Sequence, residues 1–266
     1  MLTRIVTAVV ALIVFLAIVF AGVIPLQIAI GIVILAMLYE VYGALTKSWP
    51  LKIGGYLCAL ILMAGVVFGF ETAAVSLTVT VTMIFLVFMH ERTDFKEVFA
   101  VFAMTLYVTV FMSFVPKLRT ECGLGFMMLI FIIAWGSDTF AYFGGTFFGK
   151  HKLIPKVSPK KTVEGSVCAV ICASGLCVLY LFAMNKAGYP LGGLAPSAVR
   201  YAAIALIGAV GSVLSQIGDL AASAIKRDAG IKDYGKIFPG HGGFMDRFDS
   251  VIFITPIIYY LVTTIL

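Results

Sequence analysis

We predict an all-α polytopic membrane protein with about nine transmembrane helices, and three observations support that prediction. Of the 266 residues, 62% are hydrophobic and only 12% are charged, whereas soluble domains usually carry about 25% charged residues. The apolar residues form continuous runs of about 20, the length at which a helix crosses a bilayer. Backbone polar groups in lipid must bond internally, and the short alternating segments of a barrel are missing, so the runs predict helices.

Nine apolar runs predict the spans, which in chain order are 5–23, 26–46, 51–69, 72–89, 97–115, 123–143, 166–184, 201–223 and 250–266. Pro25 separates the first two runs, which otherwise form one apolar stretch. The first run is longer than the apolar core of a signal peptide, and no small-residue cleavage site follows it. We therefore expect it to be a true span.

Lysine and arginine residues fall unevenly on the two sides of this arrangement. One side holds 15 of the 19 basic residues, and the other holds Lys117, Arg119, Lys186 and Arg200. Cytoplasmic loops are enriched in basic residues, so we expect the first side, with the N-terminus, in the cytoplasm. We expect the protein in the inner (cytoplasmic) membrane, with its active site on the cytoplasmic side. The net charge of +6 follows from this topology and does not indicate nucleic acid.

The chain changes character at about residue 134. Residues 1–134 read as N-terminal and middle transmembrane helices with short connections. Glu40 lies within a span there, near its cytoplasmic end, and we expect its carboxylate to snorkel to the interface. Residues 135–266 read as a catalytic transmembrane region with two cytoplasmic polar loops, 144–165 and 224–249, which hold 10 of the 19 basic residues. We expect the function in this second part.

Four aspartates are expected to face one shallow cavity at the cytoplasmic interface. Asp138 and Asp219 lie near the cytoplasmic ends of two spans, and Asp246 and Asp249 come directly before the last span. The helix dipole and desolvation in lipid both oppose the charge of Asp219, so a cation must compensate it. Lys226 lies on the same helix face, but a divalent metal shared with Asp246 would compensate better. Oxygen ligands of this kind suit Mg²⁺, and a second, monovalent or divalent cation beside it stays open.

The two polar loops supply the positive half of this site. The first presents Lys160, Lys161 and Thr162, and the second presents Lys226, Arg227, Lys232 and Lys236 before the pair Gly242-Gly243. Lysine and arginine neutralise phosphate oxygens, and glycines let backbone N–H groups approach a phosphate closely. Together with the carboxylates, these loops predict a site for a metal and a polyphosphate.

His241 stands beside these glycines and invites the role of general base. A phosphate monoester has its second pKa near 6 and is largely dianionic at pH 7. An attacking phosphate therefore needs no base, and we expect His241 to hydrogen-bond a phosphate or to order the loop.

The segment "SAIKRDAGIKDYGKIFPGHGGFMDRFD" (223–249) closely resembles the signature of phosphatidate cytidylyltransferases, also called CDP-diacylglycerol synthases. "QIGDLAAS" (216–223) and "WGSDTFAYFGGTFFGKHKLIPKVSPKKTVEG" (135–165) also look like shared segments of that family. The fixed positions of the signature are all met, by Ser223, Lys226, Arg227, Lys232, Asp233, Pro239, His241, Gly242, Gly243, Asp246, Arg247 and Asp249.

This resemblance implies transfer of CMP from CTP to phosphatidic acid, giving CDP-diacylglycerol and pyrophosphate in phospholipid biosynthesis, with Mg²⁺ required. The expected metal ligands are Asp138, Asp219, Asp246 and Asp249. The residues expected to carry catalysis are Asp219, Lys226, Arg227, His241, Asp246 and Asp249. The residues expected to bind substrate are Lys160, Lys161, Thr162, Ser223, Lys232, Lys236, Gly242, Gly243 and Arg247. The expected partners are CTP, phosphatidic acid and the bilayer.

Two other functions and the oligomeric state stay open at this point. A CTP-dependent kinase of a polyprenol-type lipid would need a base to activate a hydroxyl, for which the chain offers only His241 or a spare aspartate. A transporter would place polar residues near the bilayer midplane in symmetric halves, whereas these charges gather at one face and in one half. The run "GTFFG" (145–149) has the small-xxx-small spacing of helix interfaces, which mildly favours a homodimer.

Overall fold

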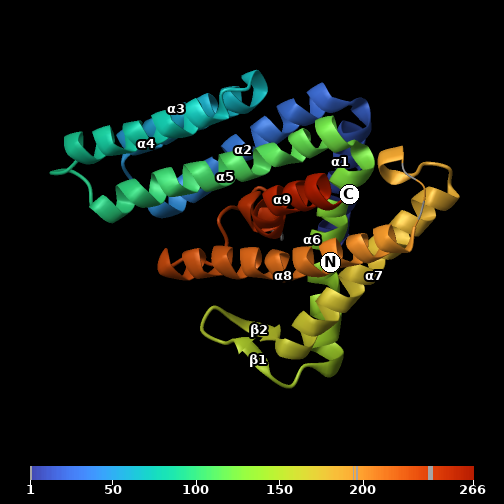
Figure 1. Ribbon diagram of the computed structural model, residues 1–266. Helices are drawn as coiled ribbons and strands as arrows, with labels where there is room; N and C mark the ends of the chain where they lie inside the picture. Colours follow the sequence, from blue (N-terminus) through green and yellow to red (C-terminus); the bar gives the residue numbers. More distant parts are fainter. Residues whose placement is uncertain (1, 194, 196, 239–241) are drawn as a thin grey trace. The chain divides into compact units, whose positions relative to one another are not determined.

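The computed structural model describes residues 2–193, 195, 197–238 and 242–266. In these residues the chain is almost entirely helical, with one small sheet (Figure 1). The helices are α1 (Leu2–Ala21), α2 (Val23–Leu45), α3 (Trp49–Phe68), α4 (Glu71–Phe88), α5 (Phe95–Cys122), α6 (Leu124–Phe148), α7 (Val163–Lys186), the short 3₁₀ helix η1 (Leu191–Gly193), α8 (Ala198–Asp228) and α9 (Met245–Ile265). The strands are β1 (Lys152–Ile154) and β2 (Ser158–Thr162).

Eight of the helices in the described part of the chain, α2 to α9, are long and apolar enough to cross a membrane. The all-α polytopic class is thereby confirmed. The first predicted span falls on α1, whose described apolar part, Val9–Ala21, is shorter. That ninth span and the cytoplasmic N-terminus stay predictions.

The helix α8 runs beyond its predicted span and corrects the expected start of the second polar loop. It continues to Asp228, so Lys226 and Arg227 lie on a helix and not in a loop. Lysine and arginine in the last turn interact favourably with the helix dipole, and Gly230 follows with a left-handed φ of +68°, a conformation that commonly ends helices.

The predicted loop 144–165 is also mostly regular structure. After α6, the strands β1 and β2 pair antiparallel, with Lys152 opposite Thr162. The hydroxyl of Thr162 accepts a hydrogen bond from the Gly165 amide and so caps the N-terminus of α7. The Glu164 carboxylate binds the start of the hairpin, because it accepts from the backbone amides of Lys150 and His151. The hairpin is therefore held to the start of α7.

Internal contacts divide the chain into two compact units. Unit 1 comprises Met1–Ser113 and Asp228–Phe248, and unit 2 comprises Phe114–Arg227 and Asp249–Leu266. The segment 228–248, which holds most of the signature, therefore packs with the N-terminal helices.

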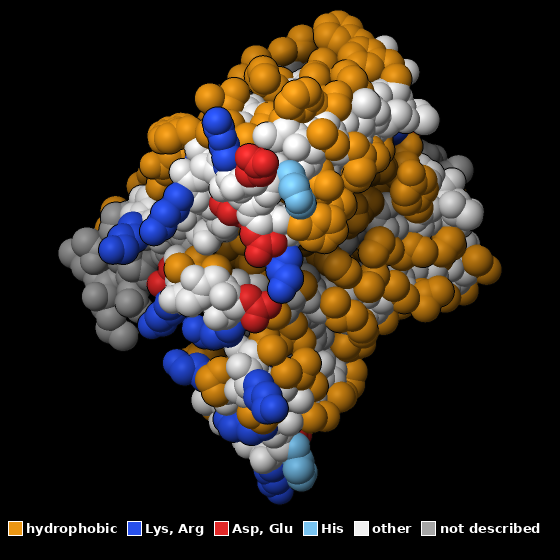
Figure 2. All heavy atoms as spheres, turned by 90° about the vertical axis from the view of Figure 1, so that its left-hand side faces the viewer, with side chains coloured by type: hydrophobic (Ala, Val, Ile, Leu, Met, Phe, Trp, Pro, Cys, Tyr) orange, Lys and Arg blue, Asp and Glu red, His pale blue; other side chains and the backbone are white. Residues whose placement is uncertain are grey.

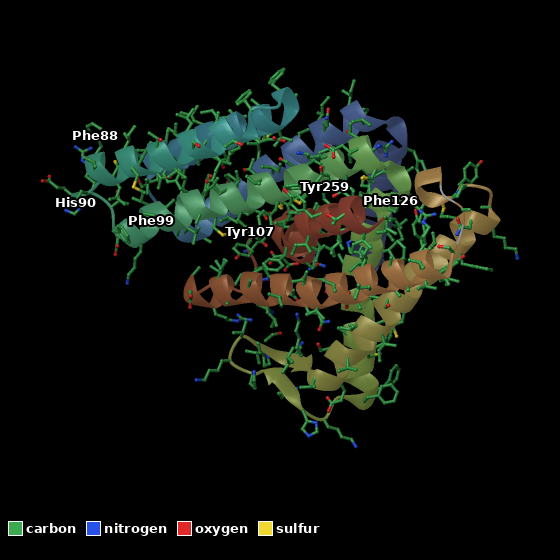
Figure 3. All side chains as sticks on the ribbon, in the orientation of Figure 1. Phe88, His90, Phe99, Tyr107, Phe126 and Tyr259 are labelled. Atoms are coloured by element: carbon green, nitrogen blue, oxygen red, sulfur yellow. The ribbon has the colours of Figure 1, made fainter. Side chains whose placement is uncertain are left out.

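In unit 1, α2, α3, α4 and the first part of α5 lie alongside one another (Figure 1). The Tyr42 hydroxyl, fully buried, lies 2.5 Å from the Thr105 hydroxyl and links α2 to α5. Gly55 on α3 has no room for a Cβ beside the Tyr42 ring. Figure 3 shows His90 in the turn that joins α4 to α5, close to Phe88. These contacts fix the helix that carries Glu40.

In unit 2, α6 and α7 approach so closely that their crossing needs glycine. A Cβ on Gly165 would meet the Ala141 carbonyl oxygen at 2.6 Å and the Gly145 amide nitrogen at 2.9 Å. Gly145 and Gly149, the two small residues of the "GTFFG" run, both lie against Thr162. This spacing therefore serves packing inside the chain, and the homodimer stays a prediction.

The helix α8 uses a second row of small residues to pack within unit 2. Gly208 lies against α7 at Ser174, Gly211 lies against Ile133 of α6, and Gly218 lies against Phe253 of α9. The Ser137 hydroxyl donates to the Ser212 hydroxyl at 2.8 Å across α6 and α8. Small residues let membrane helices approach closely and bond across the interface, which positions Asp219 one residue beyond Gly218.

Candidate functional site

The signature segment of unit 1 is organised around Asp246 in the first turn of α9. Its Oδ2 atom accepts hydrogen bonds from the Tyr234 amide at 2.9 Å and the Gly243 amide at 3.0 Å. The Phe238 amide donates to the Gly242 carbonyl at 2.9 Å. Gly242 has a φ of +83°, which favours glycine. Asp246, expected as a metal ligand, thus also holds the segment's shape.

Glu40 corrects a sequence prediction. Its side chain does not snorkel: the residue is only 3% exposed, and its two carboxylate oxygens accept from the backbone amides of Phe244 at 3.1 Å and Met245 at 2.9 Å. The start of α9 leaves amides without an intrahelical partner, so a carboxylate there is favourable by about 0.3–1 kcal/mol. Glu40 therefore caps α9 from α2.

Two glycines of the segment are needed because there is no room for a side chain. A Cβ on Gly235 or on Gly243 would overlap the Glu40 carboxylate. The Gly243 amide, expected to cradle a phosphate, donates to Asp246 instead, because Asp246 follows it within one helical turn. The phosphate-binding role of Gly242 and Gly243 stays a prediction. His241 and Pro239 lie outside the described residues.

Unit 2 holds the other three predicted metal ligands, Asp138, Asp219 and Asp249, and part of the predicted basic residues. Asp219 Oδ2 lies 2.5 Å from Lys161 Nζ, with the side chains 27% and 21% exposed. The Ser223 hydroxyl, one turn along α8, donates to Asp219 Oδ1 at 3.4 Å. Asp249 is 7% exposed and interacts electrostatically with Asp219, Asp138 and Lys226. The structure therefore brings Asp138, Asp219, Asp249 and Lys226 into one neighbourhood, and their roles stay predictions.

A cavity of about 330 Å³ opens beside this group within unit 2. Its lining includes Asp138, Lys160, Lys161, Gln216 and Asp219. The Gln216 side chain donates to the Ser166 carbonyl at 3.4 Å and holds α8 against α7. Lysines and carboxylates thus line one cavity. The lysines suit an anionic phosphate, and the carboxylates suit a cation that accompanies it.

Unit 1 has a cavity of its own, of about 490 Å³. It lies between α2, α3 and the signature segment, with Glu40, Trp49, Lys52, Asp233 and Lys236 among its lining residues. The Lys52 ammonium lies 5.4 Å from the Trp49 ring centroid, within cation–π range. Figure 2 shows charged side chains gathered among broad areas of hydrophobic ones, as expected where polar sites open on an apolar protein.

The donors fit a hard cation in kind but are not gathered as a metal centre. In the described residues, no three His, Cys, Asp or Glu side chains come together closely enough to hold an ion. Asp219 is paired with Lys161, and Asp138 accepts from the Ser250 hydroxyl at 3.4 Å. Around Asp249, however, the negative charges of Asp138 and Asp219 add to its own, whereas the positive charges are those of Lys226 and of Lys161, which pairs with Asp219. This excess of oxygen donors and negative charge suits Mg²⁺.

Comparison of the sequence with known proteins identifies the family of this chain. Residues 2–265 match the cytidylyltransferase family. The chain belongs to that family. Its relatives include the phosphatidate cytidylyltransferase of Bacillus subtilis (strain 168), 33% identical over 97% of this chain and 96% of the relative. They also include that of Staphylococcus aureus (strain COL), 33% identical over 98% of both chains, and that of Staphylococcus epidermidis, 32% identical over 98% of both.

In this cytidylyltransferase, the other predicted substrate residues differ in their surroundings. Five of them are exposed: Lys160 on β2, Arg227 at the end of α8, Lys232 and Lys236 between α8 and α9, and Arg247 in the first turn of α9. Thr162 is buried, and its hydroxyl is occupied as the α7 cap. Sequence reasoning missed Glu40 and Ser250, which is 1% exposed beside Asp249. A carboxylate inside a predicted span was the available signal for Glu40.

Proposed function

We propose that this protein is a phosphatidate cytidylyltransferase, which transfers CMP from CTP to phosphatidic acid and releases pyrophosphate. The observation that carries the proposal is the cavity of unit 2, where Lys160 and Lys161 lie beside Asp138 and Asp219 at the end of apolar helices. The names of the relatives support the same reaction. A lipid phosphate and a nucleoside triphosphate are the anionic substrates that such a hollow fits.

The proposed chemistry needs positioning and charge rather than a base. One oxygen of the lipid phosphate, ionised at pH 7, forms a bond to the α-phosphorus of CTP. The bond from that phosphorus to the bridging oxygen breaks, and pyrophosphate carries away the electron pair. Lys161, Lys226 and Arg227 stabilise the charge that develops on the oxygens, as lysine and arginine do in other phosphate transfers.

We propose that Mg²⁺ assists this reaction. Asp219 and Asp249 would hold it, with Asp138 beside them in unit 2, and the role of Asp246 as a further ligand stays a prediction. When bound, the ion supplies positive charge to phosphate oxygens. Lys161, which pairs with Asp219, would then be free to contact a substrate phosphate, because the ion would neutralise the Asp219 carboxylate in its place. A second, monovalent or divalent cation belongs to the same proposal.

The proposed setting is the cytoplasmic side of the inner membrane. The side that holds 15 of the 19 basic residues includes both predicted polar loops, 144–165 and 224–249. Cytoplasmic loops carry such an excess of basic residues. CTP is a cytoplasmic nucleotide, so the site and its soluble substrate would lie in one compartment.

A substrate panel tests the proposal. Purified protein in mixed micelles receives CTP and Mg²⁺ with phosphatidic acid, with diacylglycerol or with a polyprenol. We expect CTP to be consumed only with phosphatidic acid, and one pyrophosphate to appear per lipid converted. Consumption with an alcohol and release of CDP would instead identify a lipid kinase, and no consumption with any lipid would contradict an enzyme of this class.

A further inference from the structure

Glu40 contacts the signature segment although it lies 204 positions earlier in the chain than Phe244. Its α2 neighbour Tyr42 is fully buried and bonded to Thr105 of α5. The carboxylate therefore projects from a helix that is itself fixed within unit 1, and it is 3% exposed.

The contacts of this carboxylate are specific to the start of α9. Its two oxygens accept separately from the Phe244 and Met245 amides. Gly235 and Gly243 lie against it so closely that neither has room for a Cβ, although neither has a positive φ. Space beside Glu40, and not backbone conformation, is what requires glycine at both positions.

Asp246 lies one residue beyond Met245, and its Oδ2 atom binds the Tyr234 and Gly243 amides. The two carboxylates thus share the segment: Glu40 holds the helix start, and Asp246 holds the turn to it. Loss of the first contact would let the second shift.

We propose that Glu40 is a positioning residue for the cytidylyl-transfer reaction, acting through Phe244, Met245 and Gly243 to set the place of Asp246 and of the exposed lysines before it. This inference rests on the proposed function. A displacement of about 1 Å in such a site can cost on the order of 10² in rate, so Glu40 matters without touching substrate.

The test combines turnover with hydrogen exchange of the intact protein in detergent. Glu40→Ala should lower turnover on the order of 10²-fold and speed exchange of the Phe244 and Met245 amides about tenfold or more. Glu40→Gln keeps one acceptor oxygen and should recover part of both. The matched control is Glu97→Ala, because Glu97 accepts from the Thr46 hydroxyl in the same unit without touching the segment. It should leave both readouts within about twofold.

A second variant distinguishes a local effect at the start of α9 from a general loss of folding. Gly243→Ala should mimic Glu40→Ala in the exchange of residues 243–246, and the double variant should be no worse than either one, since contacting residues couple. Near-normal turnover in Glu40→Ala, or faster exchange spread over all of α2 to α5, would overturn the positioning role. If the wild-type protein makes no CDP-diacylglycerol, the proposed function fails, and the local exchange result still decides whether Glu40 holds the segment.

Discussion

Replacing Asp219 with asparagine should abolish turnover while the protein still folds. Asp219 Oδ2 lies 2.5 Å from Lys161 Nζ, and two unit charges at that distance attract by about 7 kcal/mol at an effective dielectric constant of about 20, before desolvation. The substitution loses this attraction but also relieves repulsion from Asp249. Because these effects oppose each other, we expect a net loss of stability of only about 1–3 kcal/mol.

Turnover should respond far more strongly than stability. Loss of a group that holds a metal or stabilises charge commonly lowers rates 10²-fold or more, about 2.7 kcal/mol of barrier. The assay is CDP-diacylglycerol formation at saturating CTP and Mg²⁺, with thermal stability followed by fluorescence-detected gel filtration. Asp228→Asn, an exposed position on the same helix, is the matched control and should stay near wild-type rates.

A double variant tests whether Asp219 serves only to neutralise Lys161. Asp219→Asn with Lys161→Met removes both charges of the pair and should regain stability but not turnover. Recovery of turnover in the double variant would mean that Asp219 only neutralises Lys161. Near-normal turnover of the single variant at saturating Mg²⁺ would refute the ligand assignment itself.

Three further predictions concern packing, topology and His241. Gly165→Ala should destabilise unit 2 by about 1–3 kcal/mol because backbone atoms of α6 occupy the space of the new methyl group, whereas Gly175→Ala meets no atom within 4 Å and should be neutral or stabilising in a thermal melt. A single cysteine at Lys156 or Lys232 in a cysteine-free background should react only with reagents that cross the membrane, because both positions are expected in the cytoplasm; labelling from outside intact cells contradicts the topology. His241→Gln should keep substantial activity and the acidic limb of the pH–rate profile, because the lipid phosphate ionises near pH 6; loss of the limb would make His241 the base.

The membrane fold could be predicted from composition because apolar length alone determines it. Eight of the nine predicted runs correspond to helices long enough to cross a bilayer. Helix ends were less predictable: α8 continues through Lys226 and Arg227 because basic residues suit a helix C-terminus. The hairpin of β1 and β2 was missed because two short strands leave no periodic apolar signal.

The site was predicted in its residue types and only partly in its contacts. Asp219, Asp249 and Lys226 lie in one neighbourhood because α8 and α9 pack side by side in unit 2 at Gly218. For Asp219 the sequence offered Lys226 on the same helix face and, as the preferred partner, a divalent metal shared with Asp246. In the structure the contact comes from Lys161 on β2, and the metal stays a prediction. Glu40 could not be paired with Phe244 from the sequence, because only tertiary packing brings α2 to the start of α9.

Labelled CTP tests the central claim most directly. Purified protein is supplied with phosphatidic acid, Mg²⁺ and CTP that carries the label on either the α- or the γ-phosphorus. The account predicts that the α label enters the lipid as CMP and that the γ label leaves as pyrophosphate. Transfer of the γ label to lipid, or absence of any label from the lipid under conditions where the protein is folded, would contradict it.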